Sequence, residues 1–164
     1  MDAQPQQAQP PSRSFGAFRT GLTGLLAALA LASGASAQKA QPLAGKGAMK
    51  IRIIVNDRAL SATLDDNATA RDFAALLPLT LTLRDYAATE KVSDLPRRLS
   101  RQGAPAAFDP SVGDITYYAP WGNLAIFHRD FGNSPGLIRL GRLDGGAELL
   151  ARPGPVTARI ELQP

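Results

Sequence analysis

The residues best suited to chemistry in this chain of 164 residues are concentrated in one aromatic segment, Gly113 to Phe127. It contains the sole tryptophan and two of the three tyrosines, side chains that combine a large apolar body with a polar group and are common in ligand pockets. We expect Trp121 in a turn between strands, at the rim of a barrel, beside Asn123, whose amide both donates and accepts hydrogen bonds. Tyr118, Trp121, Asn123 and Phe127 are therefore the predicted ligand-binding residues. Alternatively, Trp121 closes one end of the barrel.

Composition excludes several kinds of catalytic site. The chain has no cysteine and a single histidine, His128, which excludes disulfides, thiolate catalysis, zinc–thiolate sites and any metal site that needs several histidines. It contains no Gly-x-Ser-x-Gly elbow, phosphate-binding loop or dinucleotide fingerprint, so we predict neither a metal site nor a cofactor. Glu90 and Asp114 are the two carboxylates considered for acid–base chemistry. We expect Glu90 either to reach the barrel mouth or to be exposed to solvent.

Two motifs carry a resemblance to a known family. Residues 113–127 read Gly-Asp-Ile-x-Tyr-Tyr-x-Pro-Trp-Gly-Asn-Leu-x-Ile-Phe, and residues 69–81 read Thr-Ala-Arg-Asp-Phe-Ala-x-Leu-Leu-Pro-Leu-Thr-Leu. From Met49 to Pro164 the chain resembles the small bacterial cyclophilin-like domain proteins, a family of largely uncharacterised function. The resemblance implies an antiparallel cyclophilin-type barrel with two helices, and it brings no established activity.

The resemblance also raises peptidyl-prolyl isomerisation as an alternative function. Isomerases of the cyclophilin superfamily use an arginine, on a strand beside an apolar groove, to weaken the amide resonance of a proline peptide. Arg129, which ends the Phe-His-Arg triplet at 127–129, resembles that arginine, and Arg139 is a second candidate. The chain then departs from the enzymes, because it continues with Asp-Phe-Gly at 130–132 and lacks their Gln-Gly-Gly-Asp segment.

Short strands must position these residues. Apolar and β-branched residues, several of them alternating with polar ones, predict strands at 50–55, 60–64, 79–83, 114–119, 124–128, 137–143 and 156–162. The pair Asn56-Asp57 predicts a tight turn between the first two strands. On a strand, Tyr117 and Tyr118 must point to opposite faces.

Helical signals are few. Thr69 and Asp72 resemble a capping box that opens a helix at about 70–77. A second helix is expected from Ser93 to about Ser100, with a helical turn at 147–151. Many short strands with little helix to cover a flat sheet predict a mainly β protein, a small closed antiparallel cyclophilin-like barrel of about eight strands with two short helices.

The N-terminal residues predict export. Two arginines, Arg13 and Arg19, precede an uncharged Leu/Ala-rich run that ends in Ala-Ser-Ala at 35–37, the pattern of a cleavable signal peptide. The apolar run from Leu22 to Leu31 is too short to span a bilayer. We therefore predict a signal peptide at 1–37, a flexible linker at 38–48 and a barrel domain at 49–164, in a periplasmic or secreted protein without a stable membrane span after cleavage.

The charge distribution bears on the partners. The formal net charge is +4, but charges of both signs alternate along the domain without a basic block, so we expect no nucleic-acid binding. Arg97, Arg98 and Arg101 are interpreted as a solvated helix face. The function that the sequence favours is the binding of a small molecule or peptide segment at an aromatic barrel mouth. The alternative is an isomerase acting on exported proteins.

Overall fold

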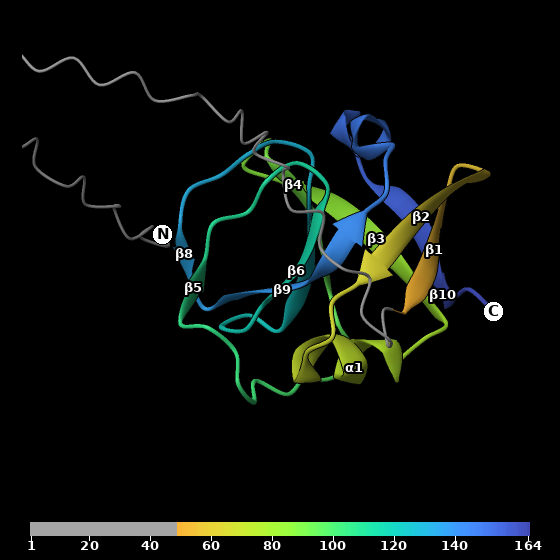
Figure 1. The fold of residues 1–164 in the computed structure, drawn as a ribbon. Coiled ribbons are helices and arrows are strands. Elements are labelled where there is room, and N and C mark those ends of the chain that lie inside the picture. The colour runs from red at the N-terminus through yellow and green to blue at the C-terminus, as the bar shows by residue number, and fades with distance from the viewer. Residues whose placement is uncertain (1–48) are drawn as a thin grey trace, which may run out of the picture. The chain divides into compact units, whose positions relative to one another are not determined.

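Eight strands close into one antiparallel barrel in the computed structural model, which describes residues 49–164 (Figure 1). The strand order around the barrel is β1-β10-β3-β4-β7-β6-β9-β2. These strands are β1 (Lys50–Val55), β2 (Arg58–Leu64), β3 (Leu79–Tyr86), β4 (Glu90–Asp94), β6 (Asp114–Tyr118), β7 (Asn123–Phe127), β9 (Leu137–Leu143) and β10 (Val156–Leu162). A separate two-stranded sheet pairs β5 (Ala107–Phe108) with β8 (Ser134–Pro135). The predicted fold class, a closed antiparallel barrel, is confirmed.

The first hairpin forms where the sequence predicts it. Asn56 and Asp57 have φ angles of 48° and 62°, and two successive left-handed residues make the turn whose twist suits a two-residue hairpin. The ladder pairs Val55 with Arg58 and continues to the pair Lys50 and Thr63. Asparagine and aspartate tolerate this backbone better than most residues, which explains why the turn lies here.

The barrel interior is filled with side chains. Alternate residues of each strand point inward, and the largest fully buried ones include Tyr117, Ile51, Ile53, Leu83, Ile115, Leu124, Ile126 and Leu140. Tyr117 is 1% exposed and points inward, whereas Tyr118 is half-buried on the other face, as the alternation predicts. An eight-stranded barrel is just wide enough for such side chains to fill it.

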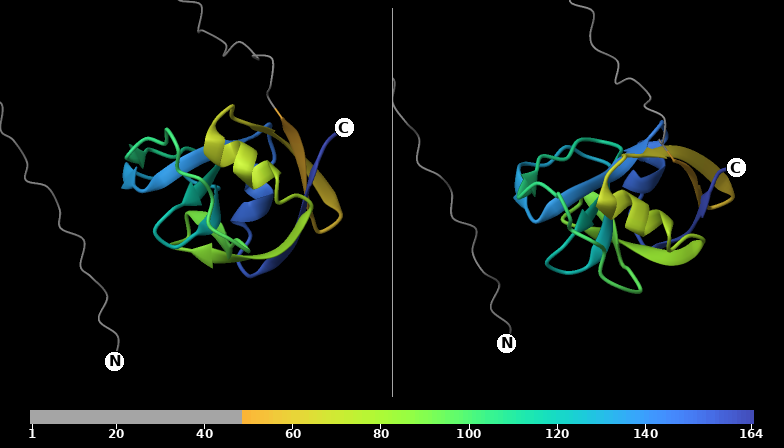
Figure 2. Two further views of the ribbon diagram at one scale, coloured as in Figure 1. Left: turned by 90° about the horizontal axis from the view of Figure 1, so that it is seen from below. Right: turned by 60° about the horizontal axis from the view of Figure 1, so that its bottom comes forward.

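One helical element covers each end of the barrel (Figures 1 and 2). Helix α1 (Ala68–Ala74) buries Phe73 in the core, and the 3-10 helix η1 (Ala147–Ala151) buries Leu150 at the opposite end. The cap of α1 is Asn67, whose Oδ1 accepts a hydrogen bond of 2.8 Å from the Ala70 amide. The helix therefore begins two residues before the predicted start.

The helix predicted from Ser93 to about Ser100 is wrong. Asp94 ends strand β4, and the chain that follows is irregular. Tertiary contacts hold it instead: the Asp72 carboxylate of α1 accepts hydrogen bonds from the Ser100 amide (2.7 Å) and from the Arg97 guanidinium (2.5 Å). The bond from Ser100 satisfies a backbone amide that a helix would otherwise pair. The bond from Arg97 places its guanidinium in an ion pair and not on a solvated helix face.

The N-terminal predictions concern residues that are not described. The predicted signal peptide at 1–37 and linker at 38–48 both lie outside residues 49–164. Within the described range, no helix is long and apolar enough to cross a membrane.

Candidate functional site

The four predicted ligand-binding residues lie on or beside the outer face of the barrel and not at its mouth. Tyr118 and Asn123 are partners in the β6–β7 ladder, and Phe127 follows Asn123 by an even number of residues on β7. All three therefore point away from the interior that holds Tyr117. Tyr118 and Phe127 belong to a small apolar cluster on this outer face, to which Phe108 of β5 contributes.

Trp121 does not close the end of the barrel. It lies in the turn between β6 and β7 with 57% of its surface exposed, so the alternative of an end plug is wrong. Its indole contacts the Tyr118 ring at a centroid distance of 5.3 Å and the Tyr86 ring at 5.5 Å. We call these three residues, Tyr86, Tyr118 and Trp121, the aromatic cluster.

Tyr86 is the residue of this cluster that sequence reasoning missed. It ends β3, and the following turn contains Ala87 and Ala88 at φ angles of 47° and 54°. Alanine seldom adopts the left-handed region, and this turn contains neither Gly nor Asn, so the sequence gives no indication of a hairpin here. The hairpin pairs Tyr86 with Glu90 and so brings both to the outer face. Backbone strain of this kind gathers at functional sites.

The barrel mouth is not available because both ends are closed. At the η1 end the ammonium of Lys91, a residue 1% exposed, donates to Asp85 Oδ1 (2.5 Å), Arg152 O (2.9 Å) and Gly154 O (2.7 Å). The hydrogen bond from Lys91, followed by the one from the Gly154 amide, lowers the pKa of Asp85. A lysine that satisfies three acceptors at this position seals the end, and the exposed aromatic residues are left on the outside.

Glu90 lies on the same outer face, between two aromatic residues. The ladders pair it with Tyr86 on one side and Phe127 on the other. Its carboxylate is half-buried and accepts a hydrogen bond from the Thr89 hydroxyl, and no ion pair to it occurs within residues 49–164. Burial raises the pKa of Glu90 despite the opposing effect of the Thr89 hydrogen bond. Of the two outcomes that the sequence left open, full solvent exposure is therefore excluded.

This raised pKa predicts that Glu90→Gln stabilises the protein at neutral pH. The folded state favours the protonated carboxyl, so the contribution of Glu90 to stability is fully present below the unfolded-state pKa, near 4.5, and is lost as the pH rises through the folded-state pKa. The glutamine variant lacks this loss. We expect its advantage in free energy of unfolding to grow from pH 4 to pH 7 in urea titrations at a series of pH values.

A matched control is Glu148→Gln, which removes an exposed carboxylate from η1. An advantage of Glu90→Gln that is the same at pH 4 and pH 7 would contradict the prediction, because it would arise from packing and not from titration.

Two buried polar groups near this face lack partners. The Oδ1 atom of Asn123 and both ring nitrogens of His128 are buried and accept or donate no hydrogen bond within the described part of the chain. Burial is the main cause that lowers the pKa of His128, and the nearby Lys91 and Arg129 charges add to it. The orphaned amide oxygen of Asn123 neighbours Tyr118 in the ladder, beside the aromatic cluster.

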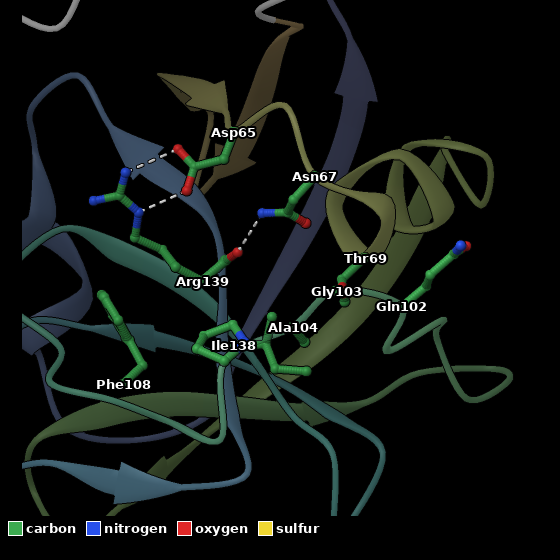
Figure 3. Close-up of a pocket in the computed structure, with 10 residues that line it drawn as sticks. Asp65, Asn67, Thr69, Gln102, Gly103, Ala104, Phe108, Ile138 and Arg139 are labelled. Atoms are coloured by element: carbon green, nitrogen blue, oxygen red, sulfur yellow. Dashed lines mark hydrogen bonds and ion pairs between the residues drawn. The ribbon is translucent and has the colours of Figure 1, made fainter.

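Arg139 lines a separate pocket of about 230 Å³ (Figure 3). Its guanidinium forms a bidentate pair with Asp65 (2.7 and 2.9 Å), and its carbonyl oxygen accepts a hydrogen bond of 3.0 Å from Asn67. The guanidinium carbon lies 6.0 Å from the centroid of the Phe108 ring, and Ile138 adds an apolar wall. The hydrogen bonds that Arg139 donates to Asp65 are the main cause that raises the pKa of Arg139; the charges of Asp65 and Asp114 add to this effect, and burial opposes it.

Two other candidates, Arg129 and Asp114, lie outside the lining of this pocket. Arg129 is exposed at the end of β7, outside the lining of the Arg139 pocket. Asp114 is buried and accepts hydrogen bonds from the Ser111 amide (2.8 Å) and Arg142 (3.2 Å), and its Oδ1 lies 3.9 Å from the Arg139 guanidinium, within ion-pair distance. It is thus next to Arg139, and it forms no hydrogen bond with Glu90 in the described part of the chain. Among residues 49–164, no group of three metal-ligating side chains comes together.

Comparison with known proteins agrees with this architecture. A model of the Cyclophilin-like family matches residues 53–161, well over half of the chain. A hypothetical protein from Archaeoglobus fulgidus, known from its solution structure, is similar with a TM-score of 0.55 and 16% identity, over 71% of this chain and 95% of that chain. That likeness concerns the fold alone. No curated protein matches the chain. The extent of the family match and the closed barrel lead to one conclusion: the chain belongs to the cyclophilin-like family.

Proposed function

We propose that this protein is an exported binding barrel that holds a peptide segment on the aromatic cluster of its outer face. The observation that carries the proposal is the 57% exposure of Trp121, whose ring is fixed between Tyr86 and Tyr118. Export is supported by the signal pattern of residues 1–37.

Residue chemistry supports a binding role for this surface. Tryptophan and tyrosine are the side chains most enriched among the residues that dominate binding energy at protein interfaces. Tyr86 is also 44% exposed, so two large rings in mutual contact, from β3 and from the β6–β7 turn, present apolar surface to solvent. Their mutual contacts reduce the rotamer freedom that would otherwise be lost on binding.

An extended peptide suits the surface better than a small molecule does. Pockets for small ligands usually bury most of the ligand surface. The cavity of about 230 Å³ beside Arg139 includes no member of the aromatic cluster. Trp121 and Tyr86 are 57% and 44% exposed, so the cluster presents an open surface, and a segment that lies across it can use several contacts at once.

A peptidyl-prolyl isomerase is the second candidate function. For the arginine that would polarise the proline amide, the pocket geometry favours Arg139 over Arg129. Arg139 has apolar neighbours in Phe108 and Ile138, whereas Arg129 is exposed at a strand end. The bidentate bond to Asp65 neutralises much of the charge that Arg139 would need to polarise an amide. This pairing supports the binding role over catalysis.

The test is selection of binders from a random peptide library on the full chain, followed by fluorescence anisotropy of a labelled binder. We expect Trp121→Ala to weaken binding by roughly 30-fold, the loss typical of a central aromatic residue. Leu162→Ala is the matched control, because Leu162 is 48% exposed but lies on β10, outside the aromatic cluster.

Unchanged affinity in Trp121→Ala would overturn the site. A rate enhancement of prolyl isomerisation that disappears in Arg139→Ala but persists in Arg129→Ala would establish the second candidate in place of simple binding.

A further inference from the structure

The three rings of the aromatic cluster have a geometry that suits a cation. The Tyr86 and Tyr118 planes lie at 84° and 82° to the Trp121 indole, so each tyrosine stands nearly perpendicular to it. Aromatic faces carry partial negative charge, and cations bind over them within about 6 Å of the centroid. In each of these pairs the edge of one ring lies against the face of the other, and Trp121 and Tyr86 still keep 57% and 44% of their surface exposed, so aromatic surface remains available to a ligand.

The negative charge of Glu90 beside the rings also favours a bound cation. Glu90 neighbours Tyr86 in the ladder, and its half-buried carboxylate has no ion pair within residues 49–164. A carboxylate that has lost water without gaining a cation is costly. Asp94 lies on the same face of β4, is exposed, and likewise has no ion pair in the described range. A bound cation would supply the partner that Glu90 lacks.

Three arginines lie on or beside this face, and none of them forms an ion pair with Glu90. Arg129 is exposed, and its backbone amide donates to Thr89 O (3.2 Å), next to Glu90. The Arg98 guanidinium donates to Ala119 O (2.7 Å) and Pro120 O (3.3 Å), which are backbone atoms of the Trp121 turn. Arg84 precedes Tyr86 by two residues on β3 and is exposed, and it forms no ion pair with Glu90. The positive charge of Arg84 therefore repels a cationic ligand on this face. Mutation can remove this charge, which makes Arg84 useful in a test.

We propose that the aromatic cluster and Glu90 bind the side chain of a lysine in an extended segment of a partner polypeptide. The inference rests on the proposed function, because it names the group that the bound peptide inserts. The lysine ammonium lies against the rings and the Glu90 carboxylate, while its aliphatic stem covers apolar surface.

The experiment uses three short Gly/Ser peptides that differ at one central residue, which is lysine, its neutral isostere norleucine, or glutamate. The full chain is titrated with each peptide, and the fluorescence of Trp121, the sole tryptophan, reports binding. We expect the lysine peptide to bind roughly tenfold more tightly than the norleucine peptide, with the glutamate peptide weakest.

Two variants separate charge from packing. Glu90→Gln is expected to bring the lysine-to-norleucine affinity ratio close to one, because only the lysine peptide loses a charge partner. Arg84→Gln is expected to increase the ratio, because it removes a like charge from the same face. A ratio that Glu90→Gln leaves unchanged would overturn the role of the carboxylate.

The outcomes also distinguish the two proposals. If norleucine and lysine peptides bind equally well, and Trp121→Ala abolishes binding of the library-selected peptide, the proposed function stands and the lysine inference is wrong. If no peptide from either experiment depends on Trp121, both proposals fail.

Discussion

Replacing Gly141 with alanine is expected to destabilise the barrel by about 3 kcal/mol or more, beyond most effects of overpacking. A Cβ atom at this position would lie 2.2 Å from Thr63 O and 2.7 Å from Leu64 Cα. Both atoms belong to the backbone of β2, so no side-chain rotation can relieve the contact. Gly141 pairs with Leu64 in the β2–β9 ladder that joins the first hairpin to the rest of the barrel. The strands must separate locally to admit one methyl group.

Urea unfolding of the purified variant measures this effect. Gly145→Ala is the matched control, because a Cβ there would meet no atom within 4 Å and its φ is not in the left-handed region. We expect that control to change the free energy of unfolding by less than about 0.5 kcal/mol. Equal stability of the two variants would show that β2 and β9 can separate without cost and would contradict the packing described here.

The elements with local signals were predictable from the sequence. Asn56 and Asp57 mark a two-residue turn, and the alternation on both sides of it fixes the register of the first hairpin. The opposite orientation of Tyr117 and Tyr118 likewise follows from strand geometry alone. The closed barrel could be inferred because many short half-buried strands leave edges that closure removes.

The segment after β4 was not predictable in the same way. Ser93 to Ser100 has a helix-like beginning, but Asp72 of α1 and the Tyr117 hydroxyl satisfy its amides, the latter through a bond of 3.2 Å from the Leu99 amide. These partners are distant in sequence, and tertiary contacts of this kind override local propensity. A prediction from neighbouring residues alone does not include these distant partners.

The sequence predicted most residues of the candidate site but not its position on the barrel. The aromatic segment around Trp121 was found from residue types, yet the site lies on the outer face because side chains fill the barrel and both ends are covered. Tyr86 contacts Trp121 although the two are far apart in the chain, and this contact depends on the β3–β4 hairpin with its two alanines at positive φ. The sequence contains no residue that predicts this turn.

The closed η1 end of the barrel gives the second large effect. Replacing Lys91 with alanine is expected to cost about 4 kcal/mol, because it removes a fully buried stem and leaves the carbonyl oxygens of Arg152 and Gly154 without their donor. Lys91→Met keeps most of the stem and loses the donors alone, so we expect about half of that cost. Urea unfolding at neutral pH measures both.

A matched lysine separates burial from pairing. Lys50 also forms an ion pair, with Asp144 at 3.0 Å, but half of its side chain is exposed, so Lys50→Ala is expected to cost less than about 1 kcal/mol. Equal losses for the Lys50 and Lys91 variants would contradict a sealed barrel end. The Lys91→Met variant also tests where binding occurs. Because the aromatic cluster lies on the outer face, the folded variant should bind the library-selected peptide with wild-type affinity, whereas a site inside the barrel would lose it.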